Sequence, residues 1–287
     1  MKTSTAAGAA VGLAAVALLP WLERRRPLRA VRETPWRRDL RNLAVAAVSA
    51  ATLSVLQRPF AEPLARTVER RRWGLAQQLP LPAWGRDAVA VLLMDYGLYA
   101  WHVLLHRSGA LWRFHRVHHA DLDLSASTAL RFHFGELAAS APWRLAQIAL
   151  FGTGPRALRI WSRLLFASIV FHHSNLRLPR GLERRLGVLI MTPRLHGLHH
   201  STDKREADSN WSSGLTLWDR LHGTWAPDPA QPAELGVKDL RRPDQLGFAG
   251  LMAMPFERRS PRAYCGEPEG SRGAVSETTG APTLPRA

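Results

Sequence analysis

Lysine is almost absent from this chain, and cysteine occurs once. Only three of the 39 basic residues are lysines (Lys2, Lys204 and Lys238), so nearly all of the positive charge is arginine. Because Cys265 is the only cysteine, no disulfide can form within the chain, and no metal site can be built from several cysteines. Any metal site must rest mainly on histidines and carboxylates, so the twelve histidines become the feature to explain.

Two missing motifs narrow the metal chemistry further. The sequence has no H-E-x-x-H motif, which argues against a zinc-dependent hydrolase with a glutamate as its general base. It also lacks the Glu-x-x-His repeats of the soluble di-iron carboxylate proteins. No redox or cytochrome domain is recognisable, so any redox reaction requires a separate electron donor.

Charge and hydropathy together indicate a membrane protein. The net charge is +16 and hydrophobic residues make up 46% of the chain, yet the mean hydropathy is −0.16. The apolar residues are gathered into blocks with arginines between them, which is the pattern of membrane spans and basic loops. A coding bias toward arginine and alanine is an alternative source of the charge. Nucleic-acid binding is not expected, because the basic residues do not follow its pattern.

Apolar blocks predict several membrane spans. Residues 5–22 are expected to be an uncleaved first span, because no small-x-small site follows the run as it would in a signal peptide. Residues 42–57 are short for a span, and a buried or interfacial helix is the alternative. Residues 88–105 contain Asp95 and His102, and ionisable groups at membrane depth usually face a protein interior and mark function.

The remaining segments complete an all-helical pattern. We expect a helical hairpin at residues 137–151 and 157–171, a connection at 58–87 and a short helix at 182–192. The loop at 23–41 carries eight arginines, so the positive-inside rule places it in the cytoplasm. Counting spans from there puts all histidines at or below that face. The sequence therefore predicts an all-α, multi-pass integral membrane protein with about four spans and a cytosolic histidine-rich cap.

Eight histidines occur in three motifs with helical spacing. Residues three and four apart lie on one face of a helix, so the imidazoles of a motif can point at one ion. Protonated imidazoles so placed would repel one another, and a cation bound by neutral imidazoles removes that cost. The motifs are His102-x-x-x-His106, His115-x-x-His118-His119 and His196-x-x-His199-His200.

Further histidines extend this set. His133 and His173 are candidate ligands, and His172 is the alternative to His173 because adjacent residues point to different helix faces. His222 lies outside any triplet and is expected to be structural. Eight to ten imidazoles are too many for one ion and suit two. Imidazole accepts zinc, copper, iron and nickel, so the ligand type leaves the metal open.

Carboxylates and a tyrosine near the motifs are candidates for an outer shell that orients the histidines. Asp95 and Tyr99 precede His102 by seven and three residues and share its helix face. Glu136 and Asp219 are the other carboxylates close to the motifs in sequence. No residue is singled out as a catalytic acid or base.

The complete series of motifs resembles the fatty acid hydroxylase/sterol desaturase superfamily. The resemblance covers roughly residues 88–225, with the segments in the superfamily's order. Phe134 stands where the superfamily often has proline, and His222 where it often has phenylalanine. The matching segments are Asp95–His106, Trp112–His119, Arg131–Glu136, His173–Pro179, Thr192–Ser201, Asn210 and Trp218–Thr224.

The resemblance implies more than the spacing does. It implies an O₂-dependent oxidoreductase that hydroxylates or desaturates a lipid (a sterol, fatty acid, carotenoid or related compound) with two iron ions, for which zinc could stand in a purified sample. Electrons would come from a separate reductase, cytochrome or ferredoxin. The ten candidate ligand histidines carry over, and Asn175 and Asn210 join the expected outer shell. A catalytic domain is then expected at 88–257, after membrane helices at 1–87 and before a disordered tail at 258–287.

A second hypothesis comes from a different class of protein. A membrane metal-binding or transport protein without redox chemistry would also need many histidines. It predicts them along a translocation path, on spans that face one another, and not gathered at one face of the membrane.

Overall fold

The structure, a computed structural model, describes residues 18–227, 229–232 and 234–257. In this part of the chain the regular elements are all helices, accompanied by isolated β-bridges, so the all-α prediction is confirmed. The predicted tail and nearly all of the predicted first span lie outside the described residues.

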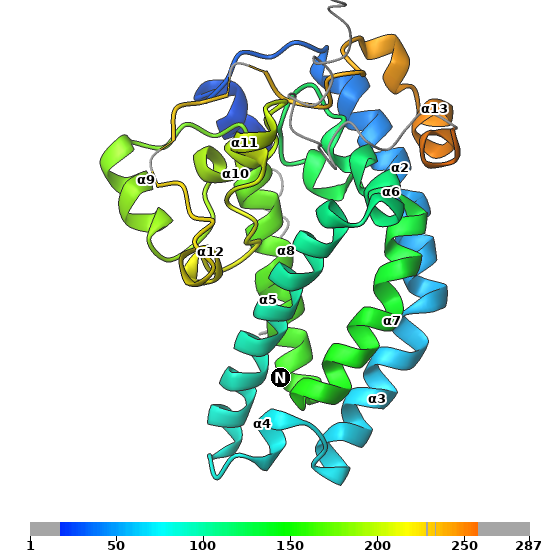
Figure 1. Cartoon of the computed structure of the whole chain (residues 1–287), viewed down its shortest axis with the longest axis vertical. Helices are drawn as coiled ribbons and strands as arrows, with labels where there is room; N and C mark the ends of the chain where they lie inside the picture. Colours follow the sequence, from blue (N-terminus) through cyan, green and yellow to red (C-terminus); the bar gives the residue numbers. More distant parts are fainter. Residues whose placement is uncertain (1–17, 228, 233, 258–287) are drawn as a thin grey trace, which may run out of the picture.

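The longer helices run along the long axis of the molecule (Figure 1). Two of them, α2 and α5, are long and apolar enough to cross a membrane, and α5 contains the predicted span at 88–105. The helices are α2 (Pro35–Leu56), α3 (Arg58–Arg71), α5 (Ala83–Arg107), α7 (Phe134–Phe151) and α8 (Pro155–His173).

Shorter elements form a cap at one end of this bundle, while α4 (Leu75–Gln78) lies at the opposite end (Figure 1). The predicted short helix at 182–192 corresponds to α9, but the helix ends at Gly187 and residues 188–192 are not helical. The cap helices are α6 (Gly109–His119), α9 (Arg180–Gly187), α10 (Pro193–His199), α11 (Lys204–Ala207), α12 (Leu217–Leu221) and α13 (Phe248–Ala253). The described residues also form the 3₁₀ helices η1 (Thr128–Leu130), η2 (Pro243–Leu246) and η3 (Met254–Phe256).

The segment predicted as a connection at 58–87 is largely helical, so that prediction is wrong for residues 58–71. Helix α3 packs against α7 and α8 through Ala61, Ala65 and Val68, which are buried. These residues are spaced four and three apart and so share one helix face. The other face carries arginines and glutamates, and these make the segment polar on average.

The predicted hairpin is confirmed as α7 and α8. Gly152 ends α7 in the left-handed region at φ 76°, where a glycine avoids the strain of a Cβ. A Cβ at Gly152 would also meet the backbone nitrogen of Gln77 at 2.9 Å, and the Gln77 amide donates to the Gly152 carbonyl at 2.8 Å. Pro155 starts α8, with the fixed φ that suits the first turn of a helix.

An apolar core fixes the cap to the bundle. Trp112 and Val117 of α6 are buried together with Val45 of α2 and with Leu246 and Leu251 near the end of the described chain. This core anchors α6, which carries three of the candidate ligand histidines.

Candidate metal centre

Eight histidines converge where the bundle meets the cap. They come from the C-terminal ends of α5, α6 and α8 and from α10 with its C-cap, and all are buried. They form two groups of four, and in each group one nitrogen per ring lies within 4.8 Å of the others. The first group is His102, His106, His119 and His199; the second is His118, His173, His196 and His200.

Adjacent histidines contribute to different groups. His118 and His119 are neighbours on α6, and His199 and His200 are neighbours at the end of α10, yet each pair is divided between the groups. Successive residues of a helix point about 100° apart, so a His-His pair naturally faces two centres. The three rings of a triplet were expected to share one face and one ion. The structure instead places each triplet beside both groups.

The nitrogen contacts in the second group test whether a cation fits there. His173 Nε2 lies 3.0 Å from both His118 Nε2 and His196 Nε2, and His196 Nε2 lies 3.1 Å from His200 Nε2. One ring nitrogen has either one hydrogen or one lone pair, so a nitrogen facing two others cannot hydrogen-bond properly to both. Two imidazole nitrogens bound at about 2.1 Å to one ion, at about 90°, would be about 3.0 Å apart. The donor set therefore fits a metal ion.

The first group supports the same conclusion. His199 Nε2 lies 3.1 Å from His102 Nε2. Both ring nitrogens of His119 are buried and have no hydrogen-bond partner among the described residues. Buried polar atoms normally have partners, so this ring is accounted for by a ligand such as a cation.

Backbone carbonyls fix the orientation of three of these rings. The Nδ1 atom of His102 lies 2.7 Å from the Trp211 carbonyl oxygen, and that of His173 lies 2.7 Å from the Ile169 oxygen. His199 Nδ1 lies 2.9 Å from the Ala207 oxygen. A carbonyl only accepts, so Nδ1 carries the hydrogen and Nε2 presents its lone pair to the group.

His115 lies beside both groups without belonging to either. Its ring centroid is 4.8 Å from that of His106 and 5.3 Å from that of His118. Its Nδ1 is 3.1 Å from Glu136 Oε1, and its buried Nε2 has no partner in the described part of the chain. The arrangement leaves Nε2 available to an ion and makes Glu136 the carboxylate that orients the ring.

The structure does not bring His133 together with the other candidates. Its Nδ1 accepts a hydrogen bond from the Gly135 amide at 2.9 Å, which caps α7, and its Nε2 lies 3.2 Å from the Met252 carbonyl oxygen. Both ring nitrogens are therefore used by the protein itself.

The two remaining histidines also lie outside the groups. His172 is buried with its ring centroid 4.1 Å from that of His196, but the neighbouring His173 supplies the nitrogen of the second group. His222 is exposed and stacks on Tyr96 and Tyr99.

The expected outer-shell residues differ in whether they contact a histidine directly or through another residue. Glu136 contacts a histidine directly, whereas Asp219 acts through Trp211. Asp219 accepts a hydrogen bond from the Trp211 amide at 2.8 Å, and the Trp211 carbonyl oxygen faces His102 Nδ1. This role of Trp211 could not be predicted from the sequence, because any residue type can supply a backbone carbonyl.

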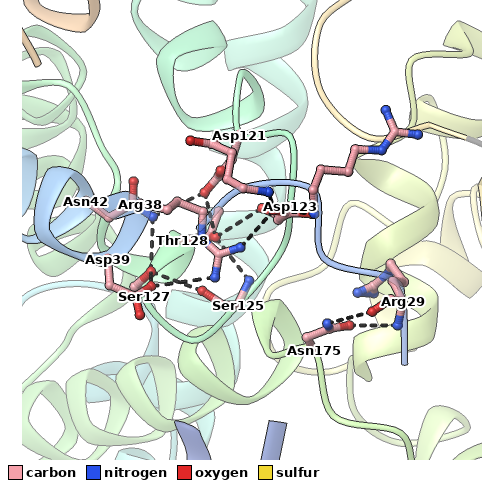
Figure 2. A network of polar contacts seen from close by, with 12 residues as sticks. Arg29, Arg38, Asp39, Asn42, Asp121, Asp123, Ser125, Ser127, Thr128 and Asn175 are labelled. Atoms are coloured by element: carbon pink, nitrogen blue, oxygen red, sulfur yellow. Dashed lines mark hydrogen bonds and ion pairs between the residues drawn. The ribbon is translucent and has the colours of Figure 1, made fainter. Parts of the chain in front are cut away.

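The other four predicted outer-shell residues hold the surrounding loops. Asp95 accepts from the Trp218 indole at 2.7 Å, and the Tyr99 hydroxyl lies 3.2 Å from Thr224 Oγ1. Asn210, at φ 53°, donates to the Leu195 carbonyl at 3.0 Å. Asn175 and Arg29 exchange two hydrogen bonds of 2.9 Å, which tie the N-terminal segment to the loop after α8 (Figure 2).

A buried polar network holds the loop that follows His119 (Figure 2). Asp121 accepts hydrogen bonds from Thr128 at 2.8 Å and from Asn42 of α2 at 3.2 Å. It also pairs with the buried guanidinium of Arg131 at 3.5 Å. Burial raises the pKa of Asp121, but Arg131 and Arg38 outweigh it, and the net shift is downward. The carboxylate is therefore ionised and anchors the end of α6.

The cap histidines are neutral in this environment. Burial, together with the neighbouring imidazoles, lowers the pKa of His118, His119, His196 and His200 well below the usual value. The same causes lower the pKa of His199 to about 3. Neutral imidazole is the form that binds a cation, so the groups need not lose protons near pH 7.

Comparison with known proteins supports the resemblance. Residues 88–224 match the fatty acid hydroxylase family. Ornithine lipid hydroxylase OlsE of Rhizobium tropici is 30% identical over 198 residues, which cover 68% of this chain and 55% of that protein. Alkylglycerol monooxygenase of Homo sapiens is 28% identical over 187 residues, covering 63% of this chain and 40% of that protein.

A third relative matches over a shorter stretch. Cholesterol 25-hydroxylase of Mus musculus is 26% identical over 148 residues, or 49% of this chain and 47% of that protein. The chain thus spans about half the length of the curated relatives it matches. No solved structure matches it.

Proposed function

We propose that this chain, whose residues 88–224 match the fatty acid hydroxylase family, is a membrane monooxygenase that hydroxylates a lipid with two bound iron ions and O₂. The observation that carries the proposal is the pair of four-histidine groups. The three relatives described above are named as hydroxylases or monooxygenases, which favours hydroxylation over desaturation.

Each group would hold one ion, and His115 is a further ligand from its position beside both. His133 is left out of the proposed ligand set because its two nitrogens have protein partners. We also propose that residues 88–257 form the catalytic domain, because η3 packs on α6 and residues of η2 and α13 belong to the same apolar core as α6.

Bound iron supplies the activation of O₂ for insertion of one oxygen atom into a C–H bond. The protein holds and orients the ligands through the Trp211 carbonyl and Glu136. Trp112 and Trp211, each 1% exposed, pack against the His106 ring and keep water from it. The electrons would come from a separate reductase, cytochrome or ferredoxin.

Exposed apolar side chains on the bundle support a lipid environment. They cover α2, α3, α7 and α8, where a soluble protein would place polar residues. The exposed set includes Leu43, Val55, Phe60, Leu150, Leu164 and Phe166. We therefore propose about four spans, including α2, α5 and the hairpin of α7 and α8.

The position of the basic segment supports a cytoplasmic metal site. Leu28 donates its amide to the Asn175 carbonyl at 2.8 Å, so the arginine-rich segment at 23–41 lies at the histidine end of the molecule. The positive-inside rule places that end in the cytoplasm. Cysteines introduced at Arg205 and Leu81, in a Cys265→Ser background, should react with an impermeant maleimide from opposite sides of the membrane.

Metal analysis combined with lipid mass spectrometry tests the function. Purified protein should contain two irons, and a host that expresses it should accumulate a lipid heavier by one oxygen. His118→Ala and His199→Ala should abolish metal loading and the new lipid, while His222→Ala should retain both. Full metal content and activity in the first two variants would falsify the proposal.

A further inference from the structure

An arginine is buried inside the helical bundle, away from the metal centre. Arg144 of α7 is 8% exposed and lies between α7 and α8, with its guanidinium carbon 4.0 Å from the centre of the Trp161 ring. It forms no ion pair with a carboxylate in the described part of the chain. Its one hydrogen bond there runs from Nη1 to Gln147 Oε1, at 2.6 Å.

Two buried groups near Arg144 are hydrogen-bond donors without an acceptor among the described residues. Gln147 is 3% exposed and Trp161 is 5% exposed. Gln147 Nε2 and Trp161 Nε1 are buried and have no partner among the described residues. The Gln147 amide also lies so close to Gly97 of α5 that a side chain at Gly97 would displace it. Arg144 therefore lies beside two further buried donors, one on α7 and one on α8, and no carboxylate among the described residues pairs with it.

This combination points to a ligand. A buried guanidinium needs a counter-charge, and buried amide and indole N–H groups need acceptors. A planar carboxylate matches the guanidinium fork with two parallel hydrogen bonds and leaves lone pairs for other donors. We propose that Arg144, Gln147 and Trp161 form a binding site for the carboxylate end of an acidic lipid.

The proposed carboxylate site lies on the same helix as Glu136, which contacts the metal centre. Arg144 follows Glu136 by eight residues on the same helix, which corresponds to about 12 Å along its axis. Glu136 contacts His115 at the centre. A lipid held by its carboxylate at Arg144 can therefore extend its chain along α7 toward the histidines. In this respect the inference rests on the proposed function, since it names an acidic lipid as the substrate class.

Quenching by brominated lipids measures binding without turnover. Full-length protein in detergent is titrated with a brominated fatty acid, the matching fatty alcohol and a brominated phosphatidic acid. The Trp161 contribution is isolated by subtracting the signal of Trp161→Phe. We expect saturable quenching by the acid, and binding weaker by roughly 30-fold or more in Arg144→Met. Arg163→Met removes an exposed arginine of α8 and should leave binding unchanged.

A second variant decides the matter where Arg144→Met does not fold. Gln147→Glu supplies an internal carboxylate next to Arg144, so the protein should fold and the acid should be excluded. Binding of the acid to Arg144→Met or Gln147→Glu as tightly as to the wild type would overturn the proposal. Equal affinity of the wild type for acid and alcohol would also overturn it, and tighter binding of phosphatidic acid would overturn the carboxylate assignment. A result against the carboxylate site would not change the metal content or the lipid oxidation of the protein. The carboxylate site and the proposed hydroxylase function can therefore fail separately.

Discussion

The Nε2 atoms of His118 and His173 lie 3.0 Å apart, although 55 positions separate the two residues in the chain. His118 lies in the last turn of α6 and His173 ends α8, and the other two members of their group come from α10 and its C-cap. An ion at this place would join three elements that are distant in sequence. Metal binding should therefore contribute to the stability of the cap as well as to chemistry.

Metal removal should lower thermal stability. An ion that binds only the folded state at about 100 times its dissociation constant adds about 2.7 kcal/mol. For a chain of this size that corresponds to about 5–10 °C in Tm. Differential scanning fluorimetry of iron-loaded and chelator-treated protein measures the shift. His118→Ala, which should not load metal, should show no shift, and an identical Tm of the wild type with and without metal would argue against ions that bridge these helices.

His133 and His119 should respond differently to substitution. His133→Ala should keep two irons per chain, because both ring nitrogens of His133 already have protein partners. His119→Ala should lose metal, since the His119 ring is buried among the other candidates and has no hydrogen-bond partner in the part of the chain that the structure describes. Inductively coupled plasma mass spectrometry of both purified variants gives the counts. Loss of iron in His133→Ala alone would reverse the proposed ligand set.

Glu136 should tune metal affinity without binding the metal. Glu136→Gln replaces the carboxylate 3.1 Å from His115 Nδ1 with an amide that holds the ring less firmly. Loss of such a partner typically costs 10–100-fold in metal affinity or activity. Competition with a chromophoric chelator measures the change. Glu62→Gln on α3, far from the histidines in sequence and partly exposed, is the matched control and should behave as wild type.

The sequence predicted the histidine motifs of the metal centre, but not how their histidines divide between the two groups of four. Spacing of three and four residues is a local property of a helix, so the three motifs and their helical character could be read directly. The separation of His118 from His119 into two groups depends on how α6 faces α5, α8 and α10, which only tertiary packing decides. His133 looked like a ligand because the sequence does not show that its ring caps α7 and meets the Met252 carbonyl. Helix α3 was missed because its buried residues, Ala61, Ala65 and Val68, are few among its charged side chains.

The buried pair of Asp121 and Arg131 should be the most sensitive ion pair in the cap. Both side chains are 0% exposed, so Asp121→Ala leaves an uncompensated guanidinium beside α6. Breaking such a pair costs about 3–5 kcal/mol, which corresponds to a fall in Tm of about 10 °C. Glu234→Ala removes a carboxylate that is 49% exposed and pairs with Arg32, and it should cost no more than about 1 kcal/mol.

A double variant separates the buried charge from the other contacts of Asp121. Asp121→Ala with Arg131→Met removes both charges, so the penalty for the unpaired guanidinium disappears and part of the lost Tm should return. The hydrogen bonds from Thr128 and Asn42 to Asp121 remain broken, so recovery should be incomplete. Thermal denaturation of the metal-free single and double variants makes the comparison without interference from the ions. A double variant less stable than Asp121→Ala alone would mean that Arg131 stabilises the cap mainly through its bond to the Val117 carbonyl, and not through its charge.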